Sequence, residues 1–326
     1  MTRGVLVTGA TGFLGRHLLA ALHTARVRTV AHVRDRAAWP YRHEGFDPVA
    51  QIEGDLLAET WRGAATAHDV ATIVHAAGIV RHTRRAPHAM TQFHVDSATH
   101  LVRTAHAIGA RVVLISSSGT VGCFRHADLA ADEHAPYAEA TIARWPYYAS
   151  KMHAERAARR LADQLGVPLA VVRLPVLLGP GDHRRRSTAH VARALAGRVP
   201  FVPTGGIAFT DVRDAAAAIV QLCALARPRP IYHLPGTNTS LAAFFQMVGE
   251  VANVAIPRRS APRWLLGGLA RLPRGVPGLP DPVLLEMAQH HWGLSSLWSQ
   301  RELGYAPRGP RQTLVDTVSW LRHTPD

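Results

Sequence analysis

Tyr147 and Lys151 stand four residues apart in the stretch Y-Y-A-S-K, and Lys151 is the only lysine of the chain. This spacing puts both side chains on one face of a helix. A lysine ammonium is a compact charge whose pKa responds to its surroundings, whereas arginine stays protonated and presents a planar fork. The pair therefore indicates a phenol whose pKa a neighbouring ammonium lowers. A composition biased toward arginine would also leave a single lysine by chance.

Three serines, Ser116, Ser117 and Ser118, follow the apolar run 111–115. Hydroxyl residues at a strand end serve turns, or they present a donor to a substrate carbonyl. With Tyr147 and Lys151 they supply the parts for proton transfer during hydride addition to a carbonyl. In this interpretation the tyrosine is the acid or base, the lysine also holds the nicotinamide ribose, and a serine steadies the oxygen.

A glycine-rich turn, T-G-A-T-G-F-L-G at 8–15, connects an apolar run to a helical pattern at the start of the chain. Glycines let a turn take positive φ and let the backbone approach a pyrophosphate, whose charge the following helix N-terminus favours. The context of strand, turn and helix predicts a dinucleotide site, with an ordinary tight turn as the alternative. The expected contacts are Gly9, Thr11, Gly12, Phe13, Leu14 and Gly15.

The type of dinucleotide is indicated by the end of the second apolar run, 27–33. An acidic residue there takes the ribose hydroxyls of NAD, whereas an arginine accepts the 2′-phosphate of NADP. Arg34 comes first and Arg36 adds a second cation, which favours NADP(H). Asp35 leaves NAD(H) open.

Two further segments are expected at the cofactor. Asp55 would accept from the adenine amino group with Leu56 against the ring, unless Asp55 is a helix N-cap. Ala76, Ala77 and Gly78 end the fourth apolar run, where small side chains leave room for a ligand.

These residues must be positioned by alternating strands and helices. Apolar strands are predicted at 4–8, 27–33, 48–52, 70–77, 111–115 and 168–174, and helices at 94–108, 144–165, 212–226, 240–252, 282–291 and 311–322. Strands that are apolar throughout favour a parallel sheet covered on both faces. We therefore expect an α/β protein with a Rossmann-type doubly wound sheet at 1–175. A smaller, mostly helical substrate lobe is expected at 176–326, with segments near 209–235 returning to the first domain.

Composition, charge and cysteine count limit the classes of function that are expected. The chain has 326 residues, 47% of them hydrophobic, and a formal charge of +14. Its arginines are scattered, so nucleic-acid binding is not expected. Cys123 and Cys223 form no metal or redox pattern, which favours a reducing, cytoplasmic setting. No signal peptide and no apolar run of bilayer length is found, so stable membrane insertion is not expected.

Other residues have less specific patterns. The twenty histidines include His82, next to Arg81, and the pair His290–His291, but no zinc-binding spacing occurs. They are expected to be solvated or in the core, and no metal site is predicted. The run R-R-R at 184–186 would meet an anionic substrate or form a solvated loop. Residues 262–272 would pack on the lobe, line an apolar pocket or lie on a membrane surface.

The order T-G-x-x-G-x-x-G, serine-rich strand end, Y-x-x-x-K and G-P-G-D resembles the extended short-chain dehydrogenase/reductase family, over nearly the whole chain. D-V-R-D at 211–214 and R-E-L-G-Y-A-P at 301–307 extend the resemblance. It implies that Tyr147 and Lys151 are the catalytic pair. Ser117 fits the active serine, and Ser116 or Ser118 fits with a one-residue slip. It also implies Pro175 near the nicotinamide, although shifted by Leu174, and a homodimer through two long helices.

Departures from the family pattern narrow the reaction. Ser118–Gly119 stands where dehydratases have Thr and an acidic residue, and Val176–Leu178 where sugar-nucleotide enzymes tend to have Asn. S-G-T-V and the apolar run resemble the dihydroflavonol reductase and hydroxysteroid dehydrogenase branches. His94 replaces a usual Asn, which bears on local hydrogen bonding and not on the fold.

We therefore expect an NAD(P)H-dependent oxidoreductase that reduces a ketone or aldehyde of an apolar or aromatic small molecule. The first alternative is an NAD(P)-dependent epimerase of a sugar or nucleotide sugar, in which the hydride returns to the same molecule. A second is a non-catalytic dinucleotide sensor, which would have no need of the intact Tyr147, Lys151 and serine set.

Overall fold

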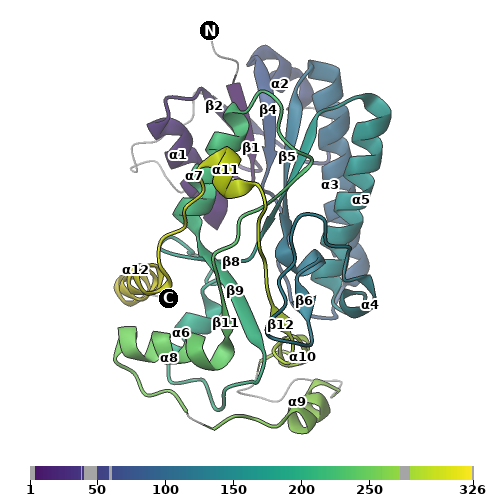
Figure 1. Ribbon diagram of the computed structural model, residues 1–326. Coiled ribbons are helices and arrows are strands. Elements are labelled where there is room, and N and C mark those ends of the chain that lie inside the picture. Colours follow the sequence, from purple (N-terminus) through teal and green to yellow (C-terminus); the bar gives the residue numbers. More distant parts are fainter. Residues whose placement is uncertain are drawn as a thin grey trace.

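The computed structural model describes residues 4–37, 39, 50–58, 61–257, 259–271 and 280–324. Its main sheet is parallel, with strand order β10-β7-β5-β4-β1-β2-β3 (Figure 1). The strands are β1 (Gly4–Thr8), β2 (Thr29–Val33), β3 (Ala50–Glu53), β4 (Val70–His75), β5 (Arg111–Ser117), β7 (Leu169–Leu174) and β10 (Ile231–His233). The order reverses between β1 and β4, so the crevice at their carboxyl ends is where such sheets bind ligands.

Helices cover both faces of this sheet, as the apolar strands require. On one face α1 (Phe13–Thr24) and α7 (Val212–Ala224) pack against each other, with α11 (Ser299–Leu303) beside them. On the other face α3 (Pro87–Ile108) and α5 (Pro146–Leu165) lie side by side (Figure 1), near the short α2 (Arg62–Ala67). Alanines of α5, Ala154, Ala158 and Ala162, let this helix lie close to the sheet and to α3.

The smaller lobe has a sheet of its own in addition to helices. Strand order there is β11-β9-β8, formed by β8 (Val176–Leu178), β9 (Gly206–Asp211) and β11 (Thr237–Ser240). The lobe helices are α6 (Ala189–Leu195), α8 (Leu241–Ala252), α9 (Arg263–Ala270), α10 (Pro282–Met287) and α12 (Pro310–His323). A short antiparallel pair, β6 (Cys123–Phe124) with β12 (His291–Trp292), joins the two parts near the short helix α4 (Glu139–Ile142).

Two segments within 209–235 belong to the main sheet's layers. Helix α7 packs on α1, and β10 extends the sheet by pairing with β7. The division at residue 175 stays a prediction, although the chain clearly returns to the first part after it has begun the second.

The predicted strands and helices differ from the observed ones mainly at their ends. Helix α3 begins at Pro87, about two turns before the predicted 94, and proline is well accommodated in the first turn of a helix. Strand β5 extends to Ser117, and α10 ends at Met287 instead of 291. Residues 48 and 49 of the predicted third strand lie outside the described residues. None of the described helices is long and apolar enough to cross a membrane.

Candidate active site

The glycine-rich turn connects β1 to α1 and is shaped by close backbone packing. Gly9 has φ +68°, and a β-carbon there would lie 2.6 Å from the backbone nitrogen of Ala77. A β-carbon at Gly15 would lie 2.2 Å from the carbonyl oxygen of Gly9, whereas at Gly12 it would meet only that oxygen, at 3.1 Å. Gly9 and Gly15 are therefore required by packing, and Gly12 presents the open side of the turn.

The N-terminus of α1 suits an anion. Gly12 is its N-cap and has no side chain, so no side chain hydrogen-bonds to the first turn at that position. Helix N-terminal N–H groups that lack internal partners bind phosphate groups. Gly9, Thr11, Gly12, Phe13, Leu14 and Gly15 all line one large pocket. The residues present therefore fit the pyrophosphate of a dinucleotide.

The residues after β2 and β3 lie at the far end of the same pocket. Arg34 is exposed there, while Arg36 donates through Nη2 to the carbonyl oxygen of Gln51, 2.6 Å away. Asp35 accepts the backbone N–H of Ala37, 2.8 Å. Of Arg34 and Arg36, Arg34 is the one that lines the pocket.

Asp55 and Leu56 also line this end. One carboxylate oxygen of Asp55 accepts the backbone N–H of Leu57, 2.9 Å, in a local turn, whereas the N-cap of the next described helix, α2, is Trp61. The second oxygen of a carboxylate remains an acceptor. Leu56 is buried in the core beside α3.

Ala76, Ala77 and Gly78 follow β4 and form the floor of the crevice with Pro175, which follows β7. A β-carbon at Gly78 would lie 3.4 Å from Nζ of Lys151 and 3.3 Å from Nε2 of His94. Glycine at this position therefore keeps the space above the lysine open.

Tyr147 and Ser117 meet at the carboxyl end of β5. Tyr147 begins α5 just after Pro146, and its side chain forms a hydrogen bond with Ser117. Ser116 instead donates to the carboxylate of Glu155. Ser118 starts a short 3-10 turn, and its carbonyl oxygen accepts the backbone N–H groups of Val121 and Gly122. Of the three serines, Ser117 is the one in contact with the tyrosine.

The pKa of the Tyr147 phenol differs from the sequence-based expectation. Burial raises this pKa to about 12, and the hydrogen bond to Ser117 only partly offsets it. The ammonium of Lys151 donates one hydrogen bond, to the carbonyl oxygen of Ile115, 3.0 Å away. The direction is therefore opposite to the expected lowering in the protein alone, because burial outweighs the opposing hydrogen bond to Ser117.

Lys151 is buried, with 9% of its surface exposed. Burial lowers the pKa of its ammonium to about 8, and the carboxylate of Glu155, one turn further along α5, acts in the opposite direction. An arginine at this position would remain fully charged, which is the chemical difference that the lone lysine suggested.

Glu155 is the centre of a buried network that sequence reasoning missed. It is fully buried and pairs with Arg173 of β7, whose Nη2 lies 2.7 Å away. It also accepts from Thr120 at 3.2 Å and from Tyr137 at 3.0 Å, in addition to Ser116. The signal was present: Glu155 follows Lys151 by four residues, and Arg173 interrupts an otherwise apolar strand. The network holds β5, α5 and β7 in fixed register beneath the site.

His94 links α3 to the site. Its Nε2 accepts the backbone N–H of Ile79 at 2.9 Å, so its Nδ1 carries the proton and donates to Ser150 at 2.8 Å. Ser150 in turn donates to the carbonyl oxygen of Tyr147, 2.6 Å. Burial lowers the pKa of His94 to about 2, which keeps the ring neutral. The histidine therefore fixes the first turn of α5 through a short chain of hydrogen bonds.

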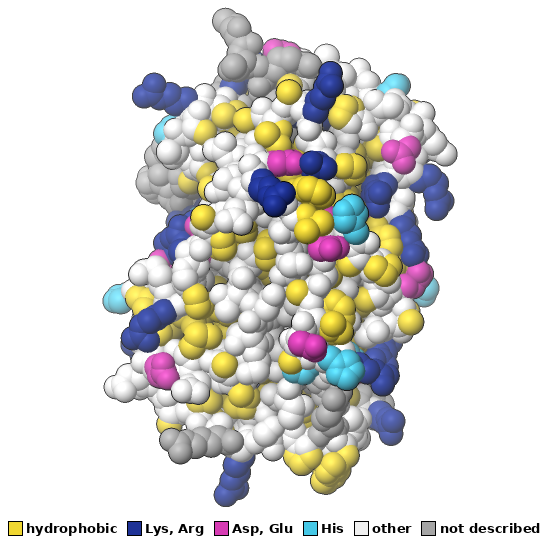
Figure 2. Space-filling model, in the orientation of Figure 1, with side chains coloured by type: hydrophobic (Ala, Val, Ile, Leu, Met, Phe, Trp, Pro, Cys, Tyr) yellow, Lys and Arg dark blue, Asp and Glu magenta, His cyan; other side chains and the backbone are white. Residues whose placement is uncertain are grey.

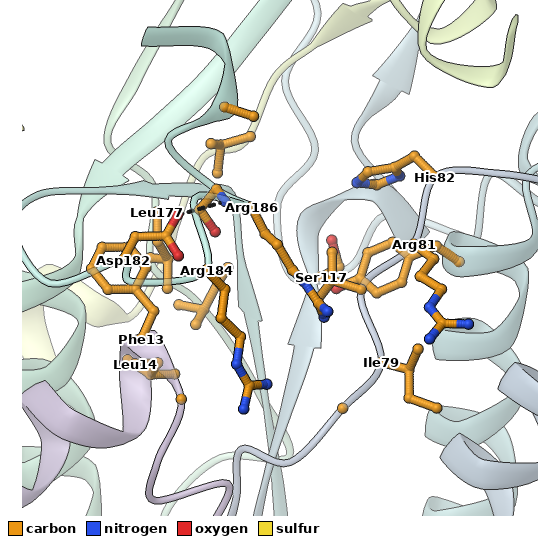
Figure 3. Close-up of a pocket in the computed structure, with 18 of the residues that line it drawn as sticks. Phe13, Leu14, Ile79, Arg81, His82, Ser117, Leu177, Asp182, Arg184 and Arg186 are labelled. Carbon is orange, nitrogen blue, oxygen red and sulfur yellow. Dashed lines mark hydrogen bonds between the residues drawn. The ribbon is translucent and has the colours of Figure 1, made fainter. Parts of the chain in front are cut away.

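The pocket is a cavity of about 1520 Å³ that runs from the glycine-rich turn past Tyr147 into the smaller lobe. Arg81 lies on one side of it, and Arg184 and Arg186 on the other (Figure 3). Its wall in the lobe is largely apolar and includes Phe201, Phe245, Leu284, Met287 and Trp292. On the face shown in Figure 2 the arginines are scattered, without a basic stripe. Within the described ranges no cluster of potential metal ligands occurs.

Comparison with known proteins agrees with this geometry. Residues 5–233 match the model of the NAD dependent epimerase/dehydratase family. The chain belongs to this family. It is 32% identical over 231 residues to ceramide reductase of Caulobacter vibrioides, an alignment that covers 68% of this chain and 61% of that protein. It is 30% identical to cinnamoyl-CoA reductase 1 of rice (Oryza sativa subsp. japonica), covering 76% and 75% of the two chains.

Solved structures of other proteins have the same fold. The crystal structure of gox2253 superposes with a TM-score of 0.85 at 25% identity, covering 98% of both chains. The UDP-glucose 4-epimerase of Thermus thermophilus, solved with NAD, gives 0.76 at 20% identity over 98% of this chain and 99% of that one. The extended short-chain dehydrogenase/reductase family and the doubly wound fold are thus confirmed. The chain is an NAD(P)-dependent enzyme of this family.

Proposed function

We propose that the enzyme uses NADPH to reduce a ketone or aldehyde carbonyl on an apolar or aromatic small molecule. The observation that carries the proposal is the course of the pocket. It leads from the glycine-rich turn, past Ser117 and Tyr147, directly into the apolar wall of the smaller lobe. A substrate with an apolar body would therefore bury that body while its carbonyl meets the two hydroxyls.

Each side chain has a separate role in the reduction of the carbonyl. Ser117 and Tyr147 donate hydrogen bonds to the carbonyl oxygen, and Tyr147, protonated at neutral pH because of its raised pKa, gives its proton to the oxygen. Lys151 binds the nicotinamide ribose through its ammonium. The bound nicotinamide supplies the hydride for the carbonyl carbon.

The names of the relatives support a reductase. Two of the relatives compared above, ceramide reductase and cinnamoyl-CoA reductase 1, are named as reductases, and the apolar run Val176–Leu178 stands where sugar-nucleotide enzymes tend to have Asn. NADPH is favoured because Arg34 lines the pocket, whereas Arg36 is bonded to β3. Asp35 also lines the pocket, and one of its carboxylate oxygens accepts the N–H of Ala37. The assembly we propose is a homodimer through the outer faces of α3 and α5.

The first test identifies the nucleotide released when freshly purified protein is denatured, together with titrations of NADPH and NADH. We expect no retained nucleotide and an affinity at least about tenfold higher for NADPH. Arg34→Leu should remove this preference, and Arg36→Leu, its matched control, should keep it. Aromatic ketones should then be reduced with loss of nicotinamide absorbance. NAD that leaves only on unfolding would contradict the proposal and favour the epimerase, whose hydride stays in the site.

A further inference from the structure

His82 lies on the wall of the pocket directly beside Tyr147. Its ring is 5.1 Å from the Tyr147 ring, edge-on at 79°, and 5.6 Å from the ring of Tyr148. Figure 3 shows the imidazole projecting toward the cavity above Arg81, on the opposite side from Arg184 and Arg186. In the sequence analysis His82 was expected, like the other histidines, to be solvated or in the core.

The nitrogens of His82 are used differently from those of its buried neighbours. His75 bonds Thr8 at 2.8 Å and Ser97 at 3.2 Å, and His94 bonds Ile79 and Ser150. In His82, by contrast, Nδ1 is buried and has no hydrogen-bond partner among the described residues. Buried polar atoms are nearly always satisfied, so an unsatisfied nitrogen on a residue that lines the pocket indicates a ring that can turn to place this nitrogen toward a ligand.

The charge state of His82 limits which chemical groups of a ligand can hydrogen-bond to its ring. Burial and the nearby His190 lower the pKa of the ring to about 4, with only a small opposing effect of Asp281. The ring is therefore neutral near pH 7, with one donor and one acceptor nitrogen. A half turn about its Cβ–Cγ bond exchanges Nδ1 with Cδ2 in nearly the same volume, so either edge of the ring can present a nitrogen. A neutral group that both donates and accepts, such as a hydroxyl, matches this imidazole.

We propose that His82 is a specificity-determining residue that hydrogen-bonds a hydroxyl on the carbon next to the reacting carbonyl of the substrate. The position follows from the contact with Tyr147. Because Tyr147 and Ser117 hold the carbonyl oxygen, a ring packed against Tyr147 lies beside the substituents closest to the reacting carbon. This inference rests on the proposed reductase function and makes it more specific: the substrate is an α-hydroxy ketone or aldehyde with an apolar body.

The test uses a matched pair of ketones, 2-hydroxyacetophenone and propiophenone, in which a methyl group replaces the hydroxyl. We expect the wild-type enzyme to prefer the hydroxyketone by about tenfold or more in kcat/KM. His82→Phe keeps the ring packing and should abolish the preference, with the rate for propiophenone within about threefold of wild type. His82→Asn puts an amide near the position of Nδ1 and should restore part of the preference. His126→Phe, at an exposed loop position after β6 and outside α3 and α5, is the control and should behave as wild type.

Each result has a distinct meaning. Reduction of both ketones without a preference, or an equal loss for both in His82→Phe, would overturn the role of His82 and leave the reductase standing. An enzyme that binds NADPH but reduces neither these ketones nor other aromatic ketones and aldehydes would overturn the reductase, and this inference with it. A preference that disappears only in His82→Phe, with NADPH affinity unchanged, supports the proposal.

Discussion

Burial acts in opposite directions on the two residues at the centre of the site. It raises the pKa of the Tyr147 phenol to about 12 and lowers the pKa of the Lys151 ammonium to about 8. The phenol is therefore a proton donor throughout the neutral range, whereas the lysine is close to losing its charge. Because only the neutral phenol is easily buried, the protein by itself favours the state that can donate a proton, which is the state that reduction needs.

Replacing Tyr147 by Phe tests this role at a single atom. We expect kcat/KM for ketone reduction to fall on the order of 10²–10⁴-fold, the usual contribution of a positioned acid. The affinity for NADPH should change by less than about threefold, because the ring and its packing remain. Steady-state kinetics and a fluorescence titration measure the two quantities. Full activity of the variant would refute the assignment of Tyr147.

The site residues that were predicted from the sequence belong to motifs whose members lie a few positions apart. Tyr147 and Lys151 are four residues apart, and the glycines of the cofactor turn fall within eight. The contacts that the sequence did not reveal join distant segments: Glu155 with Arg173, and His82 with Tyr147. Neither member of such a pair has a periodic or motif signal for the other, so only the fold brings them together. The direction of the Tyr147 pKa shift was missed for the same reason, since burial is a property of the folded chain.

At the scale of elements, the start of α1 depends on how closely the backbone of the turn packs on itself. The β-carbon of an alanine at Gly15 would lie 2.2 Å from the Gly9 oxygen and 2.8 Å from Cα of Ala10, and neither is the end of a flexible side chain. The helix can accept the extra atom only by moving away from the turn, which would misplace the N–H groups that we propose bind the pyrophosphate.

We therefore expect Gly15→Ala to lower the free energy of unfolding by about 1–3 kcal/mol and to abolish detectable NADPH binding. Gly63→Ala is the matched control, because Gly63 lies in α2 with nothing within 4 Å of the added carbon. It should raise the free energy of unfolding by about 0.4–1 kcal/mol and leave binding intact. Urea denaturation and NADPH titration compare the two variants. Normal binding by Gly15→Ala would show that the turn is not the pyrophosphate site.

Boundaries of elements were less predictable than their existence. Strand β5 continues through Ser116 and Ser117, although serine is a poor marker for a strand, because both residues pair with β7. Helix α3 starts at Pro87, before its apolar periodicity begins. In both cases tertiary contacts, which a local pattern does not contain, decide where the element ends.

At the scale of the whole molecule, burial of neutral histidines makes stability depend on pH. The pKa values of His32, His75 and His94 fall to about 4, 3 and 2. Below about pH 6.5 these histidines bind protons in the unfolded chain but not in the folded chain. Their contribution to the free energy of unfolding is therefore complete above pH 6.5 and is lost progressively as the pH falls. Each such group contributes about 1.4 kcal/mol per pH unit until its folded pKa is reached.

His94→Asn should reduce this acid sensitivity. An asparagine can keep a donor and an acceptor near Ser150 and Ile79 without gaining a charge. Urea denaturation at pH 7 and pH 5 should show a smaller loss of stability than in wild type, by about 1–2 kcal/mol. The exposed His153→Asn variant should lose as much as wild type. An unchanged loss in His94→Asn would contradict the neutral, buried state of His94.

The return of the chain to the main sheet has a consequence for how the cleft can open. After β9 the chain goes back to build α7 and β10, leaves again for β11 and α8, and revisits the first layer with α11 before ending in α12. The two parts are thus connected by several crossings of the chain instead of by a single linker. The two parts would therefore move only slightly relative to each other when a substrate enters. Selection among substrates would then depend on the shape of the entrance more than on a large closing movement.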